Sequence, residues 1–308
     1  MSQVVRERSD AANDVAATAH GRDGSRHSPM NRALGARTTR GKALTVLAVV
    51  VLLVFTLLPA FMMLSTAFDA RSNDGSRSLI PTHLTWEHFT YVLDDGGFST
   101  YLRNSMIVGI GTVVISGLLA LLAGVAVARF RFRFRTTVLV AVLVVQMVPL
   151  EALVIPMFIQ ARNLDLLNQL FGLVVVYVAF SLSFAIWMLR GFVAAVPVEI
   201  EEAAYVDGAS WFRMFRSVLL PLVAPGLVAT SIFSFITAWN EFIFAITFIA
   251  DDSKYTAAAG LQSFFGQYDN DWGAVMAGSS LITIPVMIFF IFVQRRLAEG
   301  LVSGAVKG

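Results

Sequence analysis

Long apolar stretches separated by short polar segments dominate the chain from residue 43 onward. A helix needs about 20 mainly apolar residues to cross the hydrocarbon core of a bilayer. Six stretches reach that length, and they are Ala43–Leu64, Asn104–Ala128, Thr136–Gln160, Phe171–Arg190, Leu227–Ile249 and Gly273–Gln294. We therefore predict an all-α membrane protein in which residues 43–294 form six transmembrane helices.

The composition agrees with a membrane protein and excludes an ordinary soluble domain. Apolar residues make up 56% of the 308 residues and charged residues 14%, whereas soluble domains carry about 25% charged residues. The first apolar stretch has 22 residues, which is longer than the roughly 7–15 apolar residues of a signal peptide, so we expect it to be retained. The chain has no cysteine, which excludes disulfides and thiolate metal sites.

The distribution of basic residues predicts the orientation of the helices, because Lys and Arg accumulate on the cytoplasmic side of membranes. Eighteen of the 23 lie before the first stretch, at residues 129–135, at residues 190–216 or after the last stretch, whereas five lie in the alternate connections. Both termini and the segment 191–221 are therefore expected in the cytoplasm. Residues 1–42 predict a disordered cytoplasmic tail, and residues 295–308 a second cytoplasmic tail.

The segment 197–221 interrupts the apolar pattern and predicts two short helices joined by a turn. Pro197 favours a helix start, and the acids that would complement the positive end of that helix are Glu199, Glu201 and Glu202. Gly208 is expected to end the first helix in a left-handed conformation, and Ser210 to cap the second. Pro221 is expected to end the second helix at the membrane surface.

Two interpretations of this helix–turn–helix remain. It is either an amphipathic connector that rests on lipid headgroups or a docking element for another protein. Because an anionic membrane surface repels carboxylates, a basic groove on a protein partner suits the acidic first helix better.

The spacing of residues in this segment resembles a known motif. Glu202, Ala203 and Ala204 are followed after three residues by Gly208, after nine more by Val218, and then by Leu220 and Pro221. This pattern is similar to the cytoplasmic EAA loop of ABC importer permeases, with Val in place of the usual Ile. In that family the loop docks the permease onto ATPase subunits. The resemblance implies as ATPase-coupling residues Glu199, Glu201, Glu202, Ala203, Ala204, Asp207, Gly208, Phe215, Leu220 and Pro221.

Further segments resemble the carbohydrate-importer branch, of the maltose-permease type. They are LLPAFMMLSTAF at 57–68, YLRNSMIVGI at 101–110, GVAVARFRF at 124–132, WNEF at 239–242 and GLVSGAVKG at 300–308. The resemblance implies import of a sugar, expected to be an oligosaccharide, with a glycerol-phosphate or a polyamine as the alternative substrate. It also implies as partners a second permease subunit, two copies of a cytoplasmic ATPase subunit that bind ATP and Mg, and an external sugar-binding protein. The expected location is the cytoplasmic (inner) membrane of a bacterium or archaeon.

Polar and aromatic residues inside the apolar stretches are candidates for the translocation path, since an ionisable residue in a membrane is functional by default. The candidates are Glu151, Tyr177, Phe184, Trp239, Asn240 and Glu241. Glu151 lies between Pro149 and Pro156, which would kink or break a helix, and it marks either the path or the outer headgroup region.

For the other candidates, packing between helices is favoured over contact with a sugar. Asn240 and Glu241 have apolar sequence on both sides, and buried polar side chains also hold membrane helices together. Tyr177 and Phe184 belong to an aromatic ladder with Phe180 and Trp187. Such a ladder could stack on sugar rings, but it more often packs against protein or lipid.

The sequence has no motif for catalysis. A phosphate-binding P-loop is absent, and no metal-ligand pattern occurs, so we expect no catalytic residue, metal or cofactor in this chain and no nucleic-acid partner. The rival class is a proton-coupled secondary transporter that uses Glu151 and Glu241. Such transporters often show paired repeats with matching broken helices, which this sequence lacks. The predicted outer loop at 251–272 resembles the family's loop that reaches the external binding protein.

Overall fold

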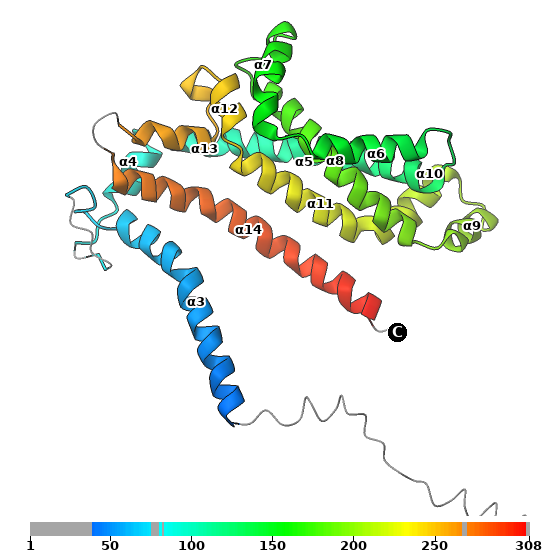
Figure 1. The fold of residues 1–308 in the computed structure, drawn as a ribbon, viewed down its shortest axis with the longest axis horizontal. Coiled ribbons are helices and arrows are strands. Elements are labelled where there is room, and N and C mark those ends of the chain that lie inside the picture. The colour runs from blue at the N-terminus through cyan, green and yellow to red at the C-terminus, as the bar shows by residue number, and fades with distance from the viewer. Residues whose placement is uncertain (1–38, 75–79, 82, 267–269, 306–308) are drawn as a thin grey trace, which may run out of the picture. The chain divides into compact units, whose positions relative to one another are not determined.

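The computed structural model describes residues 39–74, 80–81, 83–266 and 270–305. The predicted N-terminal tail at residues 1–38 and the end of the chain at 306–308 lie outside the described residues. The described chain consists of helices and the connections between them, without a named strand (Figure 1). The prediction of an all-α membrane protein is confirmed at that level.

Five helical segments of the described chain are long and apolar enough to cross a membrane. They are α3 (Thr39–Ala67), α5 (Phe98–Arg129), α8 (Leu170–Ala195), the continuous run Trp211–Asn240 and α14 (Trp272–Ala305). The run Trp211–Asn240 consists of α10 (Trp211–Met214), the π-helical turn η2 (Phe215–Leu219) and α11 (Leu220–Asn240). The remaining helices are α4 (Glu87–Leu93), α6 (Arg135–Gln146), η1 (Leu150–Leu153), α7 (Val154–Asn163), α9 (Val198–Val206), α12 (Ile243–Phe248), η3 (Asp252–Lys254), α13 (Ala257–Gly260) and η4 (Leu261–Phe264).

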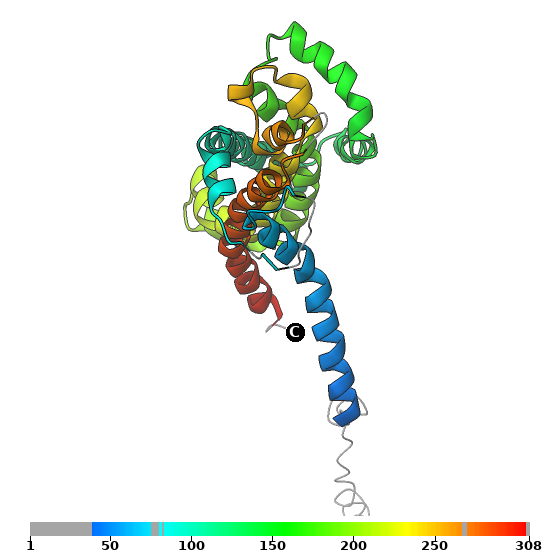
Figure 2. The same cartoon turned by 90° about the vertical axis from the view of Figure 1, so that its left-hand side faces the viewer.

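The predicted third span is not one straight helix. α6 ends at Gln146, and the axis turns by 97° before η1 and α7 continue (Figures 1 and 2). The break falls at Pro149, which lacks an N–H and disfavours helix in the residue before it. By length and composition, the described residues therefore hold five candidate spans, or six if the bent pair crosses as one.

Two predicted helix ends are wrong. Pro221 does not end the second helix of the segment 197–221, because it lies in the first turn of α11 directly after η2, where a missing N–H is tolerated. The fifth span is also not continuous to residue 249, since α11 ends at Asn240 and Glu241 is extended, with φ −71° and ψ 127°. At the C-terminus, residues 295–305 of the predicted tail are helical and continue α14.

The chain divides into two compact units at Pro59. The described part of the first unit is the N-terminal portion of α3, whose Leu, Val and Phe side chains are exposed. A helix that is apolar all round is typical of a membrane span.

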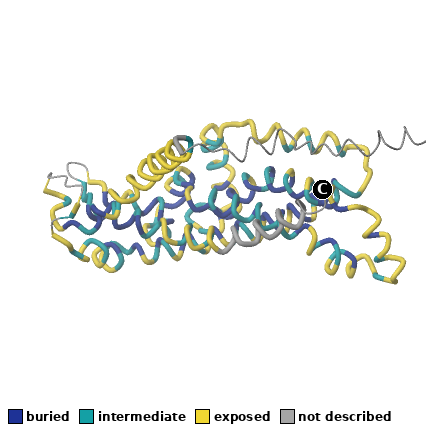
Figure 3. Tube along the Cα trace, turned by 90° about the horizontal axis from the view of Figure 1, so that it is seen from below, coloured by how far each residue is buried: buried dark blue, intermediate teal, exposed yellow. Residues whose placement is uncertain are grey.

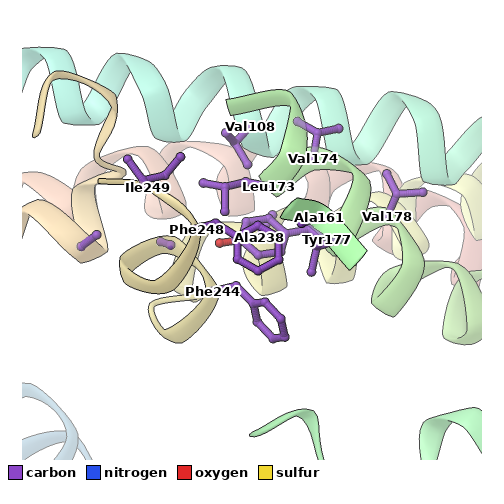
Figure 4. Close-up of a cluster of buried hydrophobic side chains, with 13 residues drawn as sticks. Val108, Ala161, Leu173, Val174, Tyr177, Val178, Ala238, Phe244, Phe248 and Ile249 are labelled. Carbon is purple, nitrogen blue, oxygen red and sulfur yellow. The ribbon is translucent and has the colours of Figure 1, made fainter. Parts of the chain in front are cut away.

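Three helices form the centre of the second unit. α5 packs along α8, α11 packs against both, and α14 packs against α11. Buried positions concentrate along these packed helices (Figure 3). One cluster of buried side chains joins them to α12, where Tyr177, Phe244 and Phe248 lie together (Figure 4). This cluster surrounds the break after α11, and a second one lies beneath α9 and η2.

Candidate functional site

The predicted turn between two short helices is present at residues 207–210. α9 begins after Pro197 and carries acids in its first turn. Gly208 follows with a φ of 81°, in the left-handed region that favours glycine. Ser210 caps α10, because its hydroxyl accepts from the backbone N–H of Arg213 at 3.4 Å. The left-handed turn and the cap are thus confirmed.

The acids of α9 do not all face the same way. Glu199, Glu202 and Asp207 are exposed, whereas Glu201 is buried. The Nε of Arg129, at the end of α5, donates to Glu201 Oε1 at 2.7 Å. Glu201, which the resemblance implies as a coupling residue together with the exposed acids, differs from them because the ion pair turns its carboxylate inward.

The other predicted coupling residues divide between surface and interior. Ala203 and Pro221 are exposed, and Ala204, Phe215 and Leu220 are partly buried against the cluster of apolar side chains beneath α9. Phe215 also stacks on Trp211, with 5.4 Å between ring centroids. The surface left by this segment is therefore an acidic helix, a small-residue patch and an exposed turn.

A second group of predicted residues forms a polar cluster at the break after α11. The hydroxyl of Tyr177 donates to Glu241 Oε2 at 2.6 Å, and both side chains are buried. The backbone N–H groups of Phe244 and Ala245 donate to the same carboxylate at 3.0–3.2 Å. Glu241 therefore caps the first turn of α12, where N–H groups lack partners inside the helix, and ties that turn to α8. In this structure Glu241 makes contacts between helices, as the helix-packing interpretation predicts.

Trp239 and Asn240 lie beside this cluster and line a concave pocket of about 650 Å³. Trp239 is 1% exposed, and its Nε1 donates to the carbonyl of Ile282 at 3.2 Å. Asn240 is exposed and its side chain donates to the carbonyl of Ile236 at 3.0 Å. The pocket's other walls come from the end of α3, from α13 and η4, and from α14.

The aromatic ladder of α8 packs against protein. Phe184 contacts Phe233 with 3.9 Å between ring centroids, and Phe180 contacts Phe244 at 5.3 Å. Trp187 is the exposed member. Of the ladder residues predicted to line the path, Phe184 thus contacts another ring of the protein, which supports packing over stacking on a sugar.

Glu151 lies apart from the Tyr177–Glu241 pair in the hydrogen-bond network. It is exposed in the short helix η1. Among the described residues its carboxylate takes part in no hydrogen bond or ion pair, and its backbone carbonyl accepts from the N–H of Val154. Its place directly after the bend fits a helix end rather than a paired carboxylate inside a bundle.

The predicted outer loop is fixed to α5 by polar contacts that sequence reasoning missed. The side chain of Asn104 donates to the carbonyls of Ser253 and Tyr255 at 2.9 and 3.0 Å, and Ser105 accepts from the N–H of Ala257 at 2.7 Å. Hydrogen bonds from Ser253 to the Asp251 carboxylate lower the pKa of that carboxyl. Residues 251–266 of the loop therefore form an ordered segment with its own buried residues.

Asn104, Ser105 and Arg129 make contacts that were not predicted from the sequence. Two polar residues at the start of an apolar stretch were a visible signal for Asn104 and Ser105. Arg129 is one of four arginines in RFRFRFR, and nothing in that run distinguishes the one whose side chain forms the ion pair.

Residues 116–302 match the protein family described as the inner membrane component of binding-protein-dependent transport systems. The chain is 41% identical over 274 residues to the diacetylchitobiose uptake system permease protein DasC of Streptomyces coelicolor, which covers 88% of this chain and 99% of the relative. It is 37% identical over 256 residues to the trehalose transport system permease protein SugB of Mycobacterium tuberculosis, which covers 82% of this chain and 93% of the relative.

A solved structure shares the fold. It is a chain in the crystal structure of a bacterial ABC transporter involved in the import of the acidic polysaccharide alginate, with a TM-score of 0.72 and 20% sequence identity. The likeness covers 87% of this chain and 98% of that one. From the family match and the two relatives, the chain belongs to the inner membrane components of binding-protein-dependent transport systems, the non-enzymatic permease subunits of ABC transporters.

Proposed function

We propose that this chain is one permease subunit of an ABC importer for a sugar, and that residues 197–221 couple it to cytoplasmic ATPase subunits. The observation that carries the coupling role is the surface of α9. Its exposed acids, Glu199 and Glu202, lie beside the exposed alanine Ala203 and the left-handed turn at Gly208. A helix with carboxylates and little side-chain bulk fits a basic groove on a partner protein.

The proposed substrate is an oligosaccharide of about the size of a disaccharide. Support comes from the two relatives, whose names refer to diacetylchitobiose and to trehalose. An aromatic wall with amide and hydroxyl groups beside it also suits a sugar, and the pocket at the break after α11 offers this combination. Its lining includes Trp239 and Phe265 together with Asn240, Gln262 and Thr283.

The proposed complex contains a second permease subunit, two copies of an ATPase subunit that bind ATP and Mg, and an external sugar-binding protein. The exposed apolar side chains of α3 are consistent with a span that contacts lipid and another permease. The complex is placed in the cytoplasmic membrane of a bacterium, with residues 197–221 on the ATPase side. The ordered loop at residues 251–266 is placed on the opposite side, toward the binding protein.

The proton-coupled alternative finds less support in the geometry. Glu241 is engaged by Tyr177 and by two backbone N–H groups, so its carboxylate already serves as a helix cap. Glu151 is exposed and forms no pair with it in the described hydrogen bonds.

Uptake by a deletion strain tests the proposal. We expect loss of uptake of one or more oligosaccharides, restored by the wild-type gene, with uptake of amino acids, glycerol-phosphate and polyamines unchanged. A defect confined to one of those other substrates would refute the sugar assignment. Uptake that continues when cellular ATP is depleted but the proton gradient is maintained would support the secondary transporter instead.

A further inference from the structure

Apart from Ala204, which is partly buried against the apolar cluster beneath α9, the attachment of α9 to the rest of the protein is mainly polar. Glu201 is the only buried residue of this helix. Three apolar side chains on its other faces are exposed to solvent: Val198 is 47%, Ile200 41% and Val206 87% exposed. Most helices are held in position by burial of an apolar face. Because α9 buries little apolar surface, its position depends unusually strongly on the carboxylate of Glu201.

That carboxylate is held by a side chain that also contacts a third helix. Arg129 is the last residue of α5, and its Nε and Nη2 both lie 2.7 Å from Glu201 Oε1. Its Nη2 also donates to the carbonyl of Val196 at 2.8 Å, and Val196 is the C-cap residue that directly follows α8. One guanidinium therefore joins the ends of α5 and α8 to the first turn of α9.

The surroundings of the pair exclude most water. The side chains of Arg129 and Glu201 are 14% and 9% exposed, and Met214 and Leu219 beside them are buried. A small cavity of about 170 Å³ adjoins the pair, and its other walls include the aromatic rings of Tyr205, Trp211 and Phe215. A charge pair with this little water keeps its strength at physiological salt, yet free space next to it leaves room for the helix to tilt.

We propose that Arg129 and Glu201 form a polar joint that positions α9 and transmits its displacement to α5 and α8. The inference rests on the proposed function, in which the exposed face of α9 contacts the ATPase. A displacement of α9 caused by the ATPase is then transmitted to α5 and α8 through the guanidinium of Arg129. Arg129 and Glu201 are positioning residues, because the pair acts on the helices and not on the sugar or the nucleotide.

The test uses the whole transporter, with its ATPase subunits and binding protein, in proteoliposomes. The variants are Glu201→Gln and Arg129→Lys, with Arg131→Ala as the matched control, since Arg131 is an exposed arginine of the same run. Three quantities are measured: the ATPase subunit that co-purifies, the sugar transported, and the ATP hydrolysed per sugar.

We expect Glu201→Gln to keep co-purification within about twofold, to lower transport at least tenfold, and to raise ATP hydrolysed per sugar several-fold. Arg129→Lys should be intermediate, because lysine keeps the charge but cannot reach both Glu201 and Val196 with a planar fork. A purely structural role would lower yield and co-purification together and leave the ATP-to-sugar ratio unchanged. Variants that match Arg131→Ala in all three quantities would overturn the joint.

A charge exchange covers the case in which a single variant does not fold. Transport by Arg129→Glu combined with Glu201→Arg should exceed that of either single exchange at least threefold, and equal or lower transport by the double variant would overturn the proposal. Failure of the proposed function is distinguishable, since the wild-type chain itself would then fail to co-purify with the ATPase or to transport sugar.

Discussion

Replacing Gly208 with valine tests whether the turn after α9 directs this helix toward the ATPase. The backbone of Gly208 has a φ of 81°, and a Cβ added there would meet no atom within 4 Å. The cost is therefore conformational and not steric. A residue other than glycine pays about 1–2 kcal/mol in the left-handed region, and a β-branched side chain is especially unfavourable there.

The conformational cost at residue 208 predicts how much the affinity for the ATPase should fall. A cost of about 1–2 kcal/mol lowers the population of the native turn about 5- to 30-fold relative to other conformations. Where only the native turn presents α9 correctly, the apparent affinity for the ATPase falls in proportion to the competent fraction. We expect Gly208→Val to weaken ATPase binding by up to that factor and to lower sugar uptake, with membrane insertion preserved.

The assay is ATPase pull-down together with sugar uptake at matched expression. Gly191→Val is the control, because Gly191 is helical in α8 and a Cβ there also meets no atom within 4 Å. Gly208→Asn should retain most activity, since asparagine visits the left-handed region readily. Glu202→Ala should have a smaller effect, because an exposed ion pair contributes about 1 kcal/mol or less. Equal ATPase binding and uptake in Gly208→Val and Gly191→Val would refute the role of the turn.

Three further outcomes follow from the described contacts. Glu241→Ala should lower the thermal unfolding temperature in detergent more than Tyr177→Phe, because it leaves a hydroxyl and two N–H groups buried without an acceptor, at about 1–3 kcal/mol each; equal shifts would contradict the cap. Gly260→Ala should destabilise the ordered loop by about 1–3 kcal/mol, because its Cβ would lie 2.1 Å from the ring of Tyr101, and limited proteolysis at the wild-type rate would contradict this. A reporter fused after Ala298 should read cytoplasmic, and an external reading would contradict the predicted orientation.

Features set by neighbouring residues were predictable from the sequence. Gly208 takes its left-handed conformation, and Ser210 its capping role, from interactions within a few positions along the chain. The apolar spans were visible for a similar reason, because membrane burial depends on local composition over about 20 residues. Pro149 marked the break in the third span, but the angle of 97° depends on what packs against α7.

Features set by distant residues were not predictable. The inward turn of Glu201 requires Arg129, which lies 72 positions earlier, and no pattern in the arginine run identifies that partner. The break at Glu241 was hidden because apolar residues flank it on both sides. The buried carboxylate of Glu241 is stabilised by the hydroxyl of Tyr177 and by N–H groups of the first turn of α12, which have no partner inside that helix.

The bend between α6 and α7 determines the parity of the membrane crossings. An even number of crossings places both ends of a chain on the same side, and an odd number places them on opposite sides. If the bent pair returned to the side where α6 begins, every later connection would change sides. The 23 basic residues would then divide fourteen to nine, in place of eighteen to five. Because the positive-inside bias favours the sharper division, we expect α6 and α7 to complete one crossing despite the 97° turn. The coupling segment then shares a side with both ends of the chain.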